Sequence, residues 1–192
     1  MPHDLAPLRP PFDEGTAATL DRWMPPGTDG AIEPLALFRL LARNDALAAV
    51  MRPLGAHQLS RRSALDVRTR ELVIDRTCAR LGCSYEWGVH AVAFGEAAGL
   101  GEADVAATAA PLDAHPWAPD DRAVLALVDA LVDTGTAPPD LLDELGARFD
   151  APALLELLVL CGWYHLIAFV ANAAALPDEP WARPLPTPDR VG

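Results

Sequence analysis

The chain has 192 residues, 51% of them apolar, and a formal net charge of −12. This length supports one domain with a proper hydrophobic core, and the negative charge argues against nucleic acid and anionic membranes as partners. All 15 basic residues are arginines, so a lysine Schiff base is excluded as a means of decarboxylation. The three cysteines do not make a disulfide framework.

The first half of the chain predicts short helices joined by turns. Residues 1–15 are rich in proline and predict an irregular arm, residues 24–30 predict a loop, and residues 55–65 predict a connector. Asp66 is a suitable N-cap for the helix that follows the connector, and Gly99 is a suitable stop for the last helix of this half. The predicted helices are 16–23, 33–44, 45–54, 66–81 and 84–98.

The second half predicts more helices and a proline-rich tail. No segment shows the alternation of a half-buried strand, so the chain is predicted to be all-α. The predicted helices are 102–110, 121–133, 139–149 and 152–176. Residues 177–192 contain five prolines and predict an extended or disordered tail, which leaves one helical domain over 16–176.

The segment Leu157–Leu176 carries no formal charge and is long enough to span a bilayer. Its polar residues Trp163 to His165 lie near the middle, however, and no basic cluster flanks it. We therefore expect a buried central helix of a helical homo-oligomer rather than a membrane span. The N-terminus has no apolar signal core, so a cytoplasmic protein is expected.

The stretch from Glu71 to His90 concentrates the reactive side chains. Cys83, Glu86, Trp87 and His90 fall at i, i+3, i+4 and i+7, which places them on one stripe of a helix. Cys83 stands at the expected N-cap and Glu86 at N3, as in a capping box. A thiol, a carboxylate and an imidazole therefore project from one helix, and Glu71 approaches from the helix before it. This pattern is typical of acid/base chemistry.

At these residues the chain resembles the carboxymuconolactone decarboxylase and alkylhydroperoxidase D family. The family signature is a Glu, eleven residues, a Cys-x-x-Cys, three residues and a His. Glu71, Cys83 and His90 stand at this spacing, but Glu86 occupies the place of the second cysteine, as in the decarboxylase-type branch. The resemblance implies an alkylhydroperoxidase D-like helical bundle that assembles as a dimer, trimer or hexamer.

The resemblance favours a partly buried Glu71 that faces His90, over a surface carboxylate paired with a nearby arginine. Glu86 lies one turn before His90 and can accept a hydrogen bond from its ring, which would orient the tautomer. Without the family spacing, His90 reads equally as a histidine satisfied within the core. Glu71, Glu86 and His90 are therefore the predicted catalytic set, with Cys83 beside them.

Cys83 has two opposed influences on its reactivity. A helix N-terminus stabilises its thiolate, whereas the nearby Glu86 carboxylate disfavours it. Glu86 cannot form the disulfide of a peroxidase motif, and Cys78 is the only local substitute. Helix geometry alone does not prepare a Cys78–Cys83 bridge, so we expect no intrinsic dithiol peroxidase activity.

Substrate contacts are harder to predict than catalytic ones. Nine arginines and four acids lie between residues 39 and 80, and this excess either pairs with acidic helices or collects an anionic ligand. Arg70 is the candidate clamp for a carboxylate. Trp87, Tyr85 and His165 are further candidates for the pocket wall, although residues of these types more often belong to the core. The ligand set is too poor in cysteine and histidine for a structural zinc site, so neither a metal nor a cofactor is expected.

The leading hypothesis is cofactor-independent acid/base catalysis on a small carboxylated or lactone-like molecule: a decarboxylation, an isomerisation or a related proton transfer. The first alternative is a thiol-dependent peroxidase or reductase that uses Cys83. The second is a helical binding protein that keeps the pocket without chemistry.

Overall fold

The computed structural model describes residues 5–24 and 33–186, and in this part of the chain all regular structure is helical. The predicted loop over 24–30 lies almost wholly outside the described residues. The helices are α1 (Glu14–Trp23), α2 (Ala36–Leu41), α3 (Asp45–Gln58), α4 (Val67–Arg80), α5 (Ser84–Ala93), α6 (Glu102–Thr108), α7 (Pro119–Thr134), α8 (Pro139–Gly146) and α9 (Ala151–Ala173), with a 3₁₀ turn at Leu112–Ala114.

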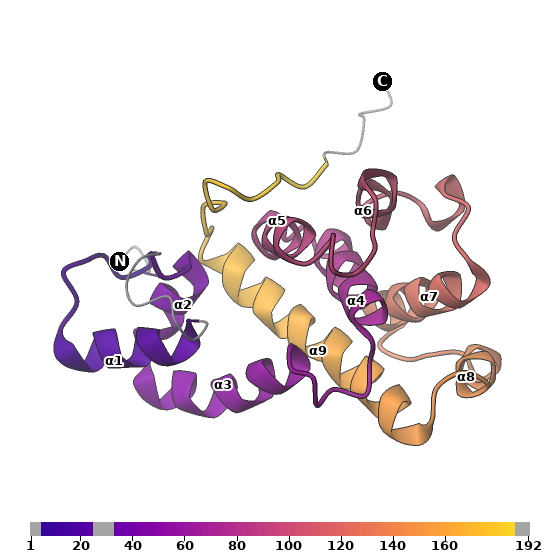
Figure 1. Cartoon of the computed structure of the whole chain (residues 1–192), viewed down its shortest axis with the longest axis horizontal. Coiled ribbons are helices and arrows are strands. Elements are labelled where there is room, and N and C mark those ends of the chain that lie inside the picture. Colours follow the sequence, from indigo (N-terminus) through magenta and orange to yellow (C-terminus); the bar gives the residue numbers. More distant parts are fainter. Residues whose placement is uncertain (1–4, 25–32, 187–192) are drawn as a thin grey trace.

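Helix α4 is the centre of the bundle. It packs against α5, α7 and α9, while α1 to α3 lie on one side and α6 to α8 on the other (Figure 1). Nearly every side chain of α4 is buried, polar ones included. A central helix with this composition must satisfy its charged groups inside the protein. The position of α4 therefore brings Glu71 into the interior.

Several boundaries follow from capping. The Asp66 side chain accepts a hydrogen bond from the Thr69 backbone N–H, which confirms the predicted N-cap of α4. Helix α3 runs past Pro53 to Gln58, so the predicted connector begins too early. Burial of Met51 and Gln58 holds the helix on both sides of the proline. Helix α5 ends at Ala93 instead of continuing to 98, and hydrogen-bonded turns replace its predicted last turn.

The turn between α4 and α5 is a Schellman motif. Gly82 adopts the left-handed conformation with φ 63°. The Cys83 N–H donates to the Cys78 carbonyl at 2.8 Å, and the Gly82 N–H donates to the Ala79 carbonyl at 3.1 Å. This motif reverses the chain within two residues and directs the first turn of α5 back along the end of α4.

Helix α9 is long and apolar enough to cross a membrane, but only 44% of its apolar window is buried in the structure. One face, with Leu157, Leu160 and Tyr164, packs into the core. The other face presents a row of exposed apolar side chains: Leu155, Leu158, Val159, Leu166 and Phe169. The helix is therefore a core element on one side and an uncovered apolar surface on the other.

Residues 177–186, which we call the C-terminal strap, lie beside α5 without regular secondary structure and turn at residues 180–182 (Figure 1). The Leu185 N–H donates to the Ser84 hydroxyl at 3.1 Å, and that hydroxyl donates to Asp178 at 3.0 Å. The strap passes so close to Gly88 that a Cβ there would lie 2.1 Å from the Arg183 carbonyl oxygen. A glycine is thus needed at position 88 for this contact.

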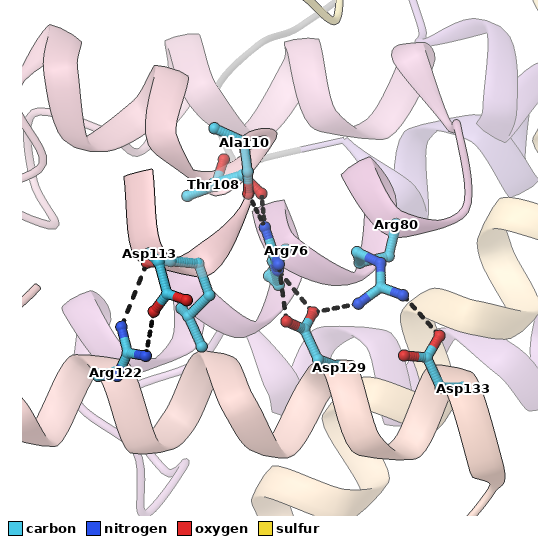
Figure 2. Close-up of polar contacts among 9 residues, drawn as sticks. Arg76, Arg80, Thr108, Ala110, Asp113, Arg122, Asp129 and Asp133 are labelled. Atoms are coloured by element: carbon cyan, nitrogen blue, oxygen red, sulfur yellow. Dashed lines mark hydrogen bonds and ion pairs between the residues drawn. The ribbon is translucent and has the colours of Figure 1, made fainter. Parts of the chain in front are cut away.

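The arginine-rich segment pairs with acidic side chains of the same fold. Figure 2 shows Arg76 between α4 and α7, where it holds Asp129 at 2.7 Å and also donates to the Thr108 and Ala110 carbonyls. Arg80 bridges Asp129 and Asp133 on the same helix (Figure 2). Of the two interpretations of the positive segment, these contacts favour internal pairing.

Candidate functional site

Glu71 and His90 form a buried pair at the junction of α4 and α5. The His90 Nδ1 lies 2.7 Å from Glu71 Oε2, and both side chains are almost fully buried. Arg70 donates from Nε to Glu71 Oε1 at 2.6 Å, so each carboxylate oxygen has a partner. The carboxylate on Nδ1 fixes the ring orientation and leaves Nε2 as the nitrogen free for proton exchange. Glu71 therefore orients His90, the role predicted for Glu86.

Tyr164 and Glu86 face the other nitrogen of His90. The Tyr164 hydroxyl lies 2.9 Å from Nε2, and Glu86 Oε2 lies 3.7 Å from it. Tyr164 comes from α9 and also packs edge-on against the imidazole, with ring centroids 5.0 Å apart. The structure thus brings Glu71, Glu86 and His90 together, with Tyr164 as a fourth member. The predicted capping box is wrong, because the Cys83 side chain makes no capping hydrogen bond and Glu86 turns inward.

Burial and charge set the protonation of this cluster. Burial opposes a charge on His90, but the Glu71 carboxylate and its hydrogen bond outweigh it and raise the pKa of the imidazole. Burial also raises the pKa of Glu86, against a smaller opposing effect of His90. It raises the pKa of Tyr164 well above its ordinary value. The cluster therefore combines a strengthened base with two neighbouring proton donors.

The two cysteines at the α4–α5 turn are neighbours. Cys78 and Cys83 are both free and fully buried, and the Cys83 N–H donates to the Cys78 carbonyl at 2.8 Å. The neighbouring Cys78 thiol is the largest influence on the pKa of Cys83 and lowers it, whereas burial raises the pKa of Cys78. The Schellman turn, and not a regular helix, sets the relation of the two backbones.

The predicted substrate contacts lie in different places. The Tyr85 hydroxyl donates to Glu179 of the C-terminal strap at 2.6 Å, and the Trp87 ring N–H donates to the Thr108 hydroxyl at 2.9 Å. Arg70 is bound to Glu71 and lies over the Phe94 ring at 5.3 Å. These three side chains are engaged within the protein.

His165 lies on α9 directly after Tyr164, but its ring contacts Phe169 on the partly exposed side of the helix. His165 therefore points to a different side of α9 from Tyr164, because successive helical residues point about 100° apart, and its place at a pocket wall stays a prediction. Among the described residues, no group of three or more histidine, cysteine or acidic side chains is arranged to hold a metal ion.

Two buried residues of the site, Tyr164 and Asp75, are not positions of the spaced motif and were not predicted from it. Tyr164 is 74 positions from His90, and only its place in the apolar helix hinted at a core role. Asp75 lies one turn after Glu71 on α4, and neither of its carboxylate oxygens has a hydrogen-bond partner. Burial raises the pKa of Asp75 well above its ordinary value. Burial of a carboxyl with no partner, close to the Glu71 carboxylate, favours its neutral form.

The sequence profile of the carboxymuconolactone decarboxylase family matches residues 45–130. This region contains α3 to α6 and the stretch from Glu71 to His90. No curated protein matches the chain.

Solved structures of low sequence identity share the fold. A peroxidase-related protein from Silicibacter sp. TM1040 superposes with a TM-score of 0.77 at 14% identity, over 93% of this chain and 94% of the other. A peroxidase-related protein with an alkylhydroperoxidase core, from Ralstonia eutropha JMP134, superposes with a TM-score of 0.77 at 15% identity, over 93% of this chain and 94% of the other. A protein of unknown function from Agrobacterium tumefaciens, named as a candidate antioxidant defence protein, gives 0.64 at 21% identity over 72% and 94%. The fold is therefore the alkylhydroperoxidase D-like helical bundle.

Proposed function

Because residues 45–130 match the sequence profile of the carboxymuconolactone decarboxylase family, we propose that the protein catalyses proton transfer without a cofactor. The substrate is a small carboxylated or lactone-like molecule, and the reaction is a decarboxylation, an isomerisation or a related step. The observation that carries this proposal is the buried chain of contacts from Glu71 through His90 to Tyr164.

His90 is the base in this proposal. Its Nδ1–H donates to Glu71, so Nε2 holds the lone pair that takes a proton from the substrate. The Glu71 carboxylate then stabilises the imidazolium that forms, and Arg70 holds that carboxylate in place. A base with a raised pKa keeps the proton long enough to return it at the end of the reaction.

Tyr164 and Glu86 are the acids. Loss of CO2 or of a proton leaves a carbanion that must be delocalised as an enolate and then protonated. Both groups lie beside Nε2, and burial raises the pKa of each and so favours its protonated form. They can therefore donate hydrogen bonds to the enolate oxygen, the role of an oxyanion hole. Arg70, the candidate clamp for a carboxylate, is bound to Glu71 instead.

Exchange of deuterium from solvent into a panel of 3-oxo acids and carboxylated lactones, followed by NMR, tests the proposal together with CO2 release. We expect His90→Ala and Glu71→Gln to lose about 10²–10⁴ in rate, the usual contribution of a positioned acid or base. The rate of Tyr164→Phe should fall by a factor in the same range. This variant should keep the fold of the protein, because the substitution removes only the hydroxyl.

Cys83→Ser is the matched control. It stands at the same turn but makes no contact with Nε2 of His90, so its turnover should stay near that of the wild type. If Cys83→Ser loses as much activity as His90→Ala, the site works through the thiol and the proton-transfer proposal is wrong.

A further inference from the structure

We propose that Phe94 is the gate of the candidate site: its ring covers His90 and moves aside before a substrate reaches the imidazole. The residue thereby sets the size of the carboxylic acids that the site accepts. The substrate class rests on the proposed proton-transfer function, whereas the covering of His90 can be measured without any turnover.

The Phe94 ring lies on His90 because of where α5 ends. Phe94 is the C-cap of this helix, and its N–H donates to the His90 carbonyl at 3.0 Å. Side chains four positions apart on a helix are neighbours on its surface. The two rings stack with centroids 5.1 Å apart and an interplanar angle of 29°. One face of the imidazole is therefore covered by a phenyl ring.

The other side chains around His90 are closed to solvent. Glu71 and Tyr164, which hold the two ring nitrogens, are buried, and so is Glu86. His90 itself is only 3% exposed. Among the described residues that bond to, pair with or stack on the imidazole, Phe94 is the one that is partly exposed. The route from solvent to His90 therefore leads past Phe94.

The Phe94 ring is weakly held, as a movable side chain must be. It is not among the partly buried apolar side chains that pack against the hydrophobic core. Its ring contacts in the described part of the chain are the His90 imidazole and the Arg70 guanidinium, whose Cζ lies 5.3 Å from the ring centroid. Stacking and cation–π contacts of a partly exposed ring are individually weak. The ring can therefore swing out without loss of core packing.

The same movement uncovers a positive charge. Arg70 is bound to Glu71 through Nε, and no other hydrogen bond of its guanidinium is found among the described residues. Its two terminal nitrogens therefore remain as donors, in the fork geometry that matches a carboxylate. An acid that takes the place of the ring meets Arg70 and His90 together. The accepted substrates are therefore small carboxylic acids no bulkier than the phenyl ring that they displace.

Acylation by diethyl pyrocarbonate tests the gate without a substrate. The reagent adds to an uncharged imidazole nitrogen, and peptide fragmentation assigns the added group to each histidine of the full-length protein. We expect Phe94→Ala to raise the rate at His90 several-fold, and Phe94→Trp to lower it, because the larger ring covers more of the imidazole. His57, whose side chain is 41% exposed, is the internal reference and should not change. An unchanged rate at His90 in Phe94→Ala would overturn the proposal.

Two comparisons separate a gate from a loosened structure. Val92→Ala removes an exposed apolar side chain of the same helix and should leave the rate at His90 as in the wild type. A loosened helix end would make His90 react faster in both Phe94 variants, and that result contradicts the gate. Opposite effects of Phe94→Ala and Phe94→Trp support it.

Substrate size separates the gate from the proposed reaction. In the deuterium-exchange assay, we expect the kcat/KM of an aryl-substituted 3-oxo acid, relative to that of a small one, to rise on the order of tenfold in Phe94→Ala. An unchanged ratio in an active protein would remove the gate and keep the proton-transfer function. Protection of His90 that depends on Phe94, in a protein that turns over none of the acids, would keep the gate and remove that function.

Discussion

Asp75 is the residue whose environment has the clearest thermodynamic consequence. Its carboxyl is buried beside Glu71 and His90 without a hydrogen-bond partner, and burial raises its pKa well above the unfolded value of about 3.9. Above that pH the unfolded chain releases this proton while the folded protein retains it. The stability of the wild type therefore decreases as the pH rises toward the folded pKa of Asp75.

Asp75→Asn removes this titration and keeps the volume. We expect the free energy of unfolding of the variant, relative to that of the wild type, to rise by about 1.4 kcal/mol for each pH unit between about pH 4.5 and the folded pKa of Asp75. Urea unfolding of both proteins at pH 4.5 and pH 7.5 measures the difference. If the difference in the free energy of unfolding between the two proteins is the same at both pH values, Asp75 is ionised in the folded state.

The residues of the site differ in how far the sequence reveals them. Glu71 and His90 follow from their spacing, because the two helices and the short turn between them are local structure. The sequence does not show which carboxylate contacts which nitrogen of His90, because the spacing of Glu71 and of Glu86 allows either one to lie beside the ring. Tyr164 reaches Nε2 only through the packing of α9 on α4, which is a tertiary contact.

At the scale of elements, the C-terminal strap joins helices that lie far apart in the sequence. The Tyr85 hydroxyl and the Ala36 N–H both donate to Glu179, so the strap ties α5 to the start of α2. Gly88→Ala would push a methyl group into the strap backbone at Arg183. Because the obstacle is backbone, we expect the strap to lift and Cys83 to become several-fold more reactive toward iodoacetamide.

Gly162→Ala is the control for this variant. Gly162 is also helical, but a Cβ there meets no atom within 4 Å. The free energy of unfolding of this variant should increase by about 0.8–1 kcal/mol from helix propensity alone, and Cys83 should react with iodoacetamide as slowly as in the wild type. Amide exchange at Leu185, which donates to Ser84, reports the strap itself. If that amide stays protected in Gly88→Ala, the strap has not moved and the expected role of the contact is wrong.

Helix positions were predictable where pattern and caps agree, as at Asp66 and α4. They were less predictable where tertiary packing overrides a local signal. Pro53 is a strong helix breaker in isolation, yet α3 continues to the buried Gln58. The prolines of the tail predict an extended or disordered chain, and residues 177–186 form neither helix nor strand. Their contacts with α5 were not predictable, because they join residues far apart in the sequence.

For the whole molecule, the uncovered face of α9 leads us to propose that the protein is a homo-oligomer. Leu155, Leu166 and Phe169 are 43–63% exposed on one helix, and a contiguous apolar surface of this kind marks an interaction site. We expect light scattering without detergent to give a multiple of the 20.5 kDa chain mass, and Phe169→Asp to shift it toward the monomer. Leu5→Asp, at an exposed apolar residue of the N-terminal arm, should leave the mass unchanged. Recovery of the wild type as a monomer, or only from membranes, contradicts the proposal.

The C-terminal strap has a consequence for how this protein can change. Glu71 and His90 come from the region that matches the family profile, whereas the strap lies well beyond residue 130. The candidate site and the segment that packs on α5 are therefore encoded in separate parts of the chain. Substitutions in this short segment can change what packs on α5 while the helices stay as they are, so it is the first place to diversify when the proposed reaction is to be extended to a larger molecule.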